Sequence, residues 1–491
     1  MTKRTTGGGA TTVTSDVDIT GRVTRSVLDP DGLNRWTEYK YDDEDRPVEQ
    51  KTALNSERFT YDKAGDTLTR TIDDGSHPRT AKFAYDQRGL RTAATSPRGT
   101  DDGSDAAAFT TTYRYDPLGR LVERIAPQVK EEKPGKPTAA VRPSTGTGYN
   151  TFGEATESRD PNGSVTRTAV DRLGRATTMT LPDYTPPGGD KITAVSRFAY
   201  DALGRRTTTI DPLGRTVTYA YDQLGHLIRQ ALPVTSLLDR AQSSPLDDKA
   251  NRYTWTPTGL QLSATGPTGA RTEATYDELG RQMTATTVER YPAPANLTMR
   301  YAWDDAGHQT ASTSPAGRVA SATYDAAGEA LTVTTPGGGA TKFAYDALGR
   351  RTDVVDATGR KSTTRYDGFG EVVGTADFGT GDTALRSTAA EYDADGHPTS
   401  VTAATGAKTV LTYDALGRLT QRVEPVADGK SITTGFGYDA AGHRTRLTDG
   451  RGNVTTYSFT PWGLPESTVE PVTKDHPKPE DRTWTSVYDA A

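Results

Sequence analysis

The sequence predicts an all-β protein in which tandem β-hairpins form a curled spiral or an open, hollow barrel. Three observations predict this fold. A Tyr-Asp turn motif recurs in phase along the whole chain, Gly (49) and Pro (29) are plentiful among 491 residues, and only 33% of the residues are hydrophobic. No segment has the apolar spacing of an amphipathic helix of useful length. Disordered chains have no reason to place Tyr, Asp and Gly in phase, so the repetition outweighs the low hydrophobic content.

The repeat is the main signal in this sequence. The hexamer Tyr-Asp-Ala-Leu-Gly-Arg occurs verbatim at 200–205, 345–350 and 413–418. Its relaxed form, aromatic-Asp-x-x-Gly, has twenty copies, and Asp follows the first position in seventeen of them. Nineteen copies are long enough to include the last position, and Gly holds it in eighteen of these, with Asp45 the exception. The first position is held by Val17, Tyr41, Tyr61, Tyr85, Tyr115, Tyr149, Val170, Tyr200, Tyr221, Trp255, Tyr276, Trp303, Tyr324, Tyr345, Tyr366, Tyr392, Tyr413, Tyr438, Phe459 and Tyr488.

The motif has the chemistry of a tight turn. Its Asp can accept hydrogen bonds from backbone N–H groups two or three residues further on, and its Gly supplies the positive φ that closes a four-residue loop. Eight of the nineteen intervals between copies are 21 residues long, which matches two strands and two four-residue turns. The sequence therefore predicts one β-hairpin per copy.

The second turn of each repeat is more variable than the first. In short intervals it is a turn such as Asp211-Pro212-Leu213-Gly214, whereas long intervals carry Pro-, Gly- and charge-rich loops. These loops cover 127–147, 181–191, 233–249 and 470–482. Since insertions gather at one class of connection, we expect the long loops to emerge on one side of the array.

A second aromatic residue is common two positions before the first. Pairs such as Tyr219 with Tyr221 and Phe343 with Tyr345 place both rings on one face of a strand. We expect such rings to form ladders across neighbouring hairpins. About forty strands cannot form a flat sheet, because strand twist accumulates, so the array should curl around a hollow centre.

Composition excludes several classes of function. The net charge of −6 leaves no basic footprint for nucleic acid, and the absence of cysteine excludes disulfides and thiolate chemistry. No apolar run approaches the length of a membrane span, and Met1–Asp16 is a Thr- and Gly-rich segment without the apolar core of a signal peptide.

The Tyr-Asp-x-x-Gly-Arg hairpins resemble the YD repeats of RHS proteins, which occur in bacterial RHS-type polymorphic toxins, wall-associated repeat proteins, Tc toxin C subunits and teneurins. The resemblance covers residues 17–491. It implies a β-hairpin spiral that closes into a hollow shell. In the bacterial toxins such a shell encloses a variable C-terminal effector, and in teneurins it is part of an adhesion ectodomain.

The resemblance also sets expectations for the organisation of the chain. We expect a disordered polar tail at 1–16 and a YD-repeat shell at 17–491 whose last repeat is truncated at Tyr488-Asp489-Ala490-Ala491. The self-cleavage motif that usually ends an RHS shell has no match, so the shell is expected to be incomplete and its effector, or its remaining segments, to lie outside this chain.

The residue types that could form a site also have roles in the turns. Four of the six histidines (His226, His308, His397 and His443) follow the turn Gly, where Arg is usual, and are expected to be exposed turn residues; His77 and His476 lie in polar loops. The repeated Asp residues are expected to cap turns rather than bind Ca²⁺. The Arg residues after the turn could form an anion-binding row, but packing on a Tyr ring or pairing with Asp is the favoured reading. The row contains Arg120, Arg175, Arg205, Arg281, Arg350 and Arg418.

The sequence thus predicts no catalytic, cofactor-binding or metal-binding residue. The leading hypothesis is a non-enzymatic shell segment that encloses a C-terminal toxin effector in the full-length protein, which would be secreted or at the cell surface. The alternative is a secreted or cell-surface adhesion protein whose long loops recognise glycans or a partner. A hydrolase on a propeller-like fold is the third and least supported hypothesis.

Overall fold

The computed structural model describes residues 2–6, 11–233, 249–289, 293–379 and 383–490. Within these ranges forty of the 42 strands belong to one continuous antiparallel sheet, and each strand of that sheet pairs with the next one along the chain. The remaining two, β12 and β13, form a separate hairpin between β11 and β14. The sheet is open and continuous, so the predicted curled hairpin array is confirmed and a ring of discrete propeller blades is not formed.

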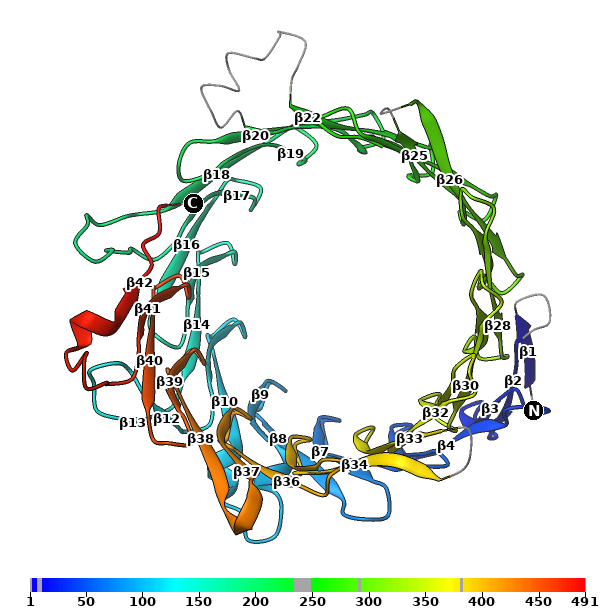
Figure 1. The fold of residues 1–491 in the computed structure, drawn as a ribbon, viewed down its shortest axis with the longest axis horizontal. Helices are drawn as coiled ribbons and strands as arrows, with labels where there is room; N and C mark the ends of the chain where they lie inside the picture. The colour runs from blue at the N-terminus through cyan, green and yellow to red at the C-terminus, as the bar shows by residue number, and fades with distance from the viewer. Residues whose placement is uncertain (1, 7–10, 234–248, 290–292, 380–382, 491) are drawn as a thin grey trace.

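The strands form a spiral of well over one turn (Figure 1). The first coil comprises β1 (Thr2–Thr6), β2 (Thr11–Val17), β3 (Val23–Leu28), β4 (Arg35–Tyr41), β5 (Pro47–Lys51), β6 (Ser56–Tyr61), β7 (Thr67–Asp73), β8 (Arg79–Tyr85), β9 (Arg91–Thr95), β10 (Thr110–Tyr115), β11 (Leu121–Ile125), β12 (Val129–Glu131), β13 (Ala139–Val141), β14 (Ser144–Tyr149), β15 (Ala155–Arg159), β16 (Val165–Val170), β17 (Ala176–Thr180), β18 (Val195–Tyr200), β19 (Arg206–Ile210), β20 (Thr216–Tyr221), β21 (Leu227–Ala231), β22 (Ala250–Trp255), β23 (Gln261–Thr265), β24 (Arg271–Tyr276), β25 (Gln282–Glu289), β26 (Ala295–Trp303) and β27 (Gln309–Thr313).

The second coil lies against the beginning of the first. It comprises β28 (Val319–Tyr324), β29 (Ala330–Thr334), β30 (Ala340–Tyr345), β31 (Arg351–Val355), β32 (Lys361–Tyr366), β33 (Val372–Phe378), β34 (Ala384–Tyr392), β35 (Pro398–Thr402), β36 (Lys408–Tyr413), β37 (Leu419–Pro425), β38 (Ser431–Tyr438), β39 (Arg444–Thr448), β40 (Val454–Phe459), β41 (Pro465–Val469) and β42 (Thr483–Thr485). Side chains 277 to 316 residues apart meet between the coils, so one full turn of the spiral takes roughly 300 residues.

The only helical elements among the described residues are four short 3-10 turns: η2 (Pro97–Gly99), η3 (Ala106–Phe109), η4 (Ala427–Gly429) and η5 (Pro479–Arg482). No helix in the described ranges is long and apolar enough to cross a membrane.

Each coil has two rims, because consecutive turns of an antiparallel meander lie on opposite edges. The YD rim carries the turns that follow the aromatic positions, such as 201–204, and the loop rim carries the alternate turns, such as 211–214, and the long loops. The described long loops, at 127–147, 181–191 and 470–482, therefore emerge on one side, as the sequence predicts. The loop rim of the first coil packs against the YD rim of the second coil.

The N-terminal segment differs from its expected disordered state. Thr2–Thr6 forms β1 and pairs with β2 in a register that joins Thr2 to Ser15 and Thr6 to Thr11. Thr is a good strand former, and β2 offers this segment a free edge to pair with. Polarity alone is therefore a poor guide to disorder in a sheet whose strands are themselves rich in Thr.

The apolar core is thin, as the composition predicts. The buried hydrophobic residues of the described chain are Val27, Ala126, Val129, Tyr184, Ala194, Ala250 and Ala440. Several lie where the coils meet: Val129 is on β12, which contacts β38, and Tyr184 packs against Trp462 of the second coil. No described strand crosses the centre of the ring in Figure 1.

Candidate functional site: the repeat clamp and the seam between coils

The Asp of each repeat holds its own turn closed. In the copy at 200–205, the Asp201 amide donates to the Arg205 carbonyl at 2.9 Å and the Gly204 amide donates to the Asp201 carbonyl at 3.0 Å. One carboxylate oxygen of Asp201 accepts from the amides of Leu203 (3.0 Å) and Arg205 (2.9 Å). Gly204 has φ +81°, a conformation that costs glycine nothing. The Asp residues are thus turn caps, and in the described ranges no group of three or more His, Cys, Asp and Glu side chains could hold a metal ion.

The Arg after the turn joins each hairpin to the next. Arg205 donates from Nε to Asp201 at 2.7 Å and from Nη1 to the Asp222 carbonyl of the following turn at 2.9 Å. Its guanidinium lies 4.9 Å from the ring centroid of Tyr221. The Tyr221 hydroxyl in turn donates to the Arg206 carbonyl at 2.9 Å. We call this set of contacts the repeat clamp.

The clamp recurs along the spiral. Arg120, Arg175, Arg350 and Arg418 make the same contacts with their own Asp and the next Tyr, and Arg281 pairs with Asp277 and reaches the Asp304 carbonyl. The prediction that these arginines pack on Tyr rings or pair with Asp is confirmed. The predicted ladder of stacked aromatics is only partly right, because between hairpins the aromatic rings alternate with Arg or His side chains.

The four turn histidines occupy the Arg position of the clamp. Their Nδ1 atoms lie 2.8 to 3.1 Å from the preceding Asp carboxylate, and their rings stack on the next aromatic at centroid distances of 4.6 to 5.7 Å. Their side chains are only 21 to 30% exposed. The expectation that they are exposed is wrong, because the ring covers the next hairpin. His77, by contrast, is 68% exposed and lies 3.5 Å from Asp101.

The hydrogen bonds of the turn alter its electrostatics. The side chains of Arg46 and Arg175 lower the pKa of Asp42 and Asp171, respectively. The backbone amide of Arg120 lowers the pKa of Asp116. These carboxylates are therefore held in their charged form, which is the form that caps the turn.

A second set of contacts joins the two coils. At two turns of the second coil, the residue after the turn Gly is Glu instead of Arg. The carboxylate of each Glu forms an ion pair with an Arg on the loop rim of the first coil. Arg35 donates to both carboxylate oxygens of Glu329 at 2.6 Å, and Arg79 pairs in the same way with Glu371. The Arg79 guanidinium also lies 3.8 Å from the ring centroid of Phe369.

Two of the long loops belong to this seam. Glu132, just after β12, donates its amide to the Tyr438 carbonyl at 2.7 Å, and its carboxylate accepts from Arg446 at 2.6 Å. In the loop 181–191, the Pro182 carbonyl accepts from the indole of Trp462 at 2.6 Å. The loop 233–249 lies almost entirely outside the described residues. Sequence reasoning missed the seam, although the three Glu residues in the Arg position (Glu154, Glu329 and Glu371) were a visible signal.

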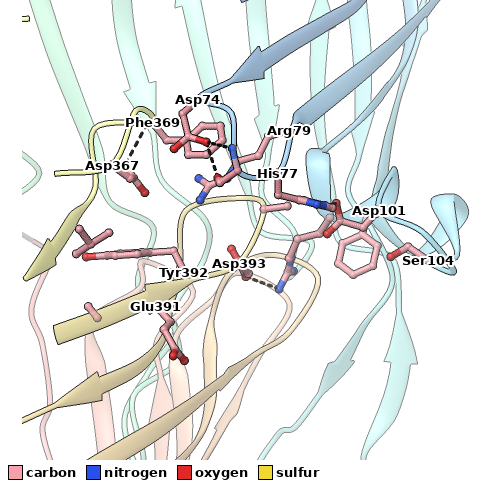
Figure 2. Close-up of a pocket in the computed structure, with 16 residues that line it drawn as sticks. Asp74, His77, Arg79, Asp101, Ser104, Asp367, Phe369, Glu391, Tyr392 and Asp393 are labelled. Carbon is pink, nitrogen blue, oxygen red and sulfur yellow. Dashed lines mark hydrogen bonds and ion pairs between the residues drawn. The ribbon is translucent and has the colours of Figure 1, made fainter. Parts of the chain in front are cut away.

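A cavity of about 700 Å³ with charged and aromatic lining residues opens at the seam (Figure 2). Asp74, His77, Arg79 and Arg98 line it from the first coil, and Phe369 and Asp393 are among the residues that line it from the second. Arg98 pairs with Asp393 at 3.3 Å and Asp395 at 3.1 Å. These charged groups join one coil to the other.

The fold and the clamp together define a class of protein, a spiral shell built from YD hairpins. A family model described as RHS Repeat matches residues 200–234, 303–340, 324–361, 392–430 and 438–473. These segments of the chain are therefore RHS/YD repeats. A search of curated proteins finds no match.

Solved structures support the same fold. The chain is similar to the crystal structure of TcdB2-TccC3 without its hypervariable C-terminal region, with a TM-score of 0.70, 15% identity, and coverage of 91% of this chain and 26% of that one. For the TcdB2-TccC3-Cdc42 crystal structure the TM-score is 0.69 and the identity 13%, with coverage of 94% of this chain and 29% of that one. For the Photorhabdus luminescens Tc holotoxin pore with the mutation TccC3-D651A the TM-score is 0.68 and the identity 13%, with coverage of 94% of this chain and 28% of that one. The chain thus spans under a third of the length of the chains it matches.

Proposed function

We propose that this chain is a non-enzymatic wall segment of an RHS-type toxin shell, and that the full-length protein encloses a C-terminal effector. The observation that carries the proposal is the seam. A spiral wound over itself and joined by charged pairs and interlocked loops makes a continuous wall, whereas a ligand-binding array would leave its loops free. The similarity in fold to TcdB2-TccC3 structures supports the same role.

The alternative role, recognition of glycans or of a partner cell by the long loops, loses part of its basis. The loops at 127–147 and 181–191 contribute Glu132 and Pro182 to contacts between coils, so their exposed surface is reduced. The shell role uses these same contacts, and we therefore favour it. A full-length shell protein of this class would be secreted or delivered to the cell surface.

Encapsulation can be tested by limited proteolysis of the full-length protein. We expect the polypeptide that follows the repeats to resist protease in the wild type and to become sensitive when the seam is opened by Arg79→Ala with Glu371→Ala. Arg215→Ala is the matched control, because the ion pair of Arg215 within the described chain is with Asp211 of its own turn. Equal sensitivity of the downstream polypeptide in the wild type and the opened variant would contradict the proposal, as would a reading frame that encodes no effector.

A further inference from the structure

The chain contains one Asn-Gly sequence, Asn162-Gly163, and it lies at the seam between the coils. These two residues end the turn Asp160-Pro161-Asn162-Gly163 on the loop rim of the first coil, between β15 and β16. An asparagine that precedes glycine is especially prone to deamidation, because glycine has no Cβ to hinder attack of its backbone nitrogen on the side-chain amide carbon. This turn is therefore the place in the chain where that reaction is chemically easiest.

The second coil holds the Asn162 side chain in place. Its Nδ2 donates to the carboxylate of Asp439, 277 residues away in the sequence, at 2.8 Å. An ionised carboxylate only accepts hydrogen bonds, so this contact requires a donor on residue 162. Asp439 is the only charged residue among the buried ones of the described chain, and its carboxylate also accepts from the backbone amide of His443 at 2.8 Å. The Asn162 amide is thus bonded to a carboxylate that has little access to water.

The closed turn also restrains the nucleophile of the reaction. The Gly163 amide donates to the Asp160 carbonyl at 3.0 Å, and the Asp160 carboxylate accepts from the Ser164 amide at 2.7 Å. For attack, the Gly163 nitrogen must lose its proton and approach Cγ of Asn162, and the hydrogen bonds of the turn and of Asp439 oppose this movement. Asn162 and Ser164 also line a cavity of about 410 Å³, which admits water. Restraint, and not a lack of water, therefore protects Asn162 while the seam is closed.

We propose that Asn162 is a deamidation site that the closed seam protects, and that its modification prevents the seam from closing again at this turn. When the coils part, the Gly163 nitrogen attacks Cγ of Asn162 and a C–N bond forms. The bond from Cγ to Nδ2 breaks, and the leaving NH2 group takes the Gly163 amide proton and departs as ammonia. Water then opens the cyclic imide by adding OH to one of its two carbonyl carbons and H to its nitrogen. The product is aspartate or isoaspartate at position 162, and no group is oxidised or reduced.

The product does not fit the closed seam. It places a second carboxylate against Asp439, where a donor and an acceptor are now 2.8 Å apart, and two carboxylates repel each other and cannot share a hydrogen bond without a proton. The Asp439 carboxylate cannot turn away freely, because it caps its own turn through the His443 amide. The isoaspartate form also adds a methylene to the backbone of a four-residue turn. One opening of the seam can thus leave a covalent change that keeps this part of the two coils apart.

Mass spectrometry of the peptide that contains Asn162 tests the protection, with the purified chain incubated at neutral pH. Glu132→Ala removes the ion pair with Arg446 that joins the coils beside this turn, and it should raise the deamidation rate by at least about tenfold. Glu273→Ala is the matched control, because Glu273 pairs with Arg271 of its own strand, and it should deamidate at the wild-type rate. Circular dichroism checks that the variants retain the β fold.

The chain unfolded in urea gives the unprotected rate for comparison. We expect folded wild type to deamidate at Asn162 far more slowly than the unfolded chain. A folded wild type that deamidates as fast as the unfolded chain, or a Glu132→Ala variant that is no faster than wild type, would overturn the proposal.

Hydrogen exchange tests the consequence of the modification. Asn162→Asp imitates the product, and it should speed exchange of the Glu132 amide, which donates to the Tyr438 carbonyl across the seam, by at least about tenfold. Asn162→Ala is the control, because it removes the same hydrogen bond without adding a charge, and its effect should be smaller. Exchange in Asn162→Asp that equals the exchange in wild type or in Asn162→Ala would show that the product does not force the coils apart, and the proposal would fail.

Discussion

At the scale of single residues, the repeat clamp explains why the aromatic position is nearly always Tyr or Trp. The side chain at this position must offer a ring on which Arg or His can pack. It must also offer a hydrogen-bond donor to a backbone carbonyl of the preceding hairpin. Tyr supplies a hydroxyl, and Trp255 and Trp303 donate from their indole N–H at 2.7 and 2.9 Å. Phe459 lacks a donor, and its ring is stacked on His443 at 4.6 Å.

Removing one clamp hydroxyl should have a small, local cost. We expect Tyr221→Phe to lower the stability of hairpin β20–β21 by about 1 kcal/mol, because the Arg206 carbonyl loses its hydrogen bond while the ring contact remains. Tyr413→Phe is the control, since the Tyr413 hydroxyl makes no hydrogen bond within the described residues. Hydrogen exchange of the hairpin amides measures both; equal effects would refute the role of the hydroxyl.

At the scale of the hairpin, the turn glycines have two roles that substitution can separate. Gly307 and Gly328 both have positive φ (+90° and +85°), so alanine is strained at either. A Cβ at Gly307 would meet nothing within 4 Å, whereas at Gly328 it would lie 2.6 Å from Nε2 of His308. Some turn glycines are therefore also required by the clamp of the preceding hairpin.

We expect Gly307→Ala to cost about 1 kcal/mol and Gly328→Ala about 1 kcal/mol more, because the second substitution also displaces the His308 ring from Tyr324. Urea denaturation of the two variants gives the comparison. In a His308→Ala background the difference between the two glycines should disappear, and its persistence would show that the clash is not its cause.

Turn aspartates make the hairpins sensitive to acid. The lowered pKa of Asp116 means that its charged form is favoured by folding, so its contribution to stability is present above the unfolded pKa of about 4 and is lost as pH falls through the lower folded value. Asn150 caps its turn through the same two amide hydrogen bonds, at 3.0 and 3.1 Å, with a side chain that cannot be protonated.

Asp116→Asn should therefore reduce the acid sensitivity of its hairpin. We expect the variant to lose less stability than wild type between about pH 7 and pH 3, measured by urea midpoints at each pH. Its stability at neutral pH should be somewhat lower, since the charged hydrogen bond to Arg120 is replaced. A variant as acid-sensitive as wild type would show that this carboxylate contributes little.

At the scale of the whole molecule, the ion pairs that join the two coils are largely buried, so each matters more than a surface ion pair. Arg79 and Glu371 are each 14% exposed, and Arg79 also covers Phe369. Removing one partner of such a pair leaves the other charge poorly solvated, whereas exposed pairs contribute little.

We expect Arg79→Ala to loosen the second coil by about 3 kcal/mol, seen as faster hydrogen exchange in β33 and β34, and Arg215→Ala to cost less than about 1 kcal/mol. The hairpins themselves should persist, because every strand keeps its neighbours in the sheet. Global unfolding of the Arg79 variant would contradict a seam that acts only between coils.

Much of this molecule is decided locally and can be predicted from sequence. A Tyr-Asp-x-x-Gly turn closes by hydrogen bonds within five residues, and its Arg reaches only to the next hairpin, so one copy of the motif contains nearly all the information for its own structure. This is why the repeat, the hairpins, the side from which the loops emerge and the Arg–Tyr packing could be predicted. The half-buried histidines were missed because burial depends on the neighbouring ring.

The seam was decided only by the tertiary structure. Whether Glu371 meets Arg79, or Trp462 meets Pro182, depends on how many hairpins complete one turn of the spiral, and that number is set by small twist and curvature angles summed over some 25 hairpin strands. A small change in the angle per strand would shift every contact to a different partner. The sequence by itself therefore determined the repeating wall, and the accumulated curvature of the sheet decided which parts of that wall face each other.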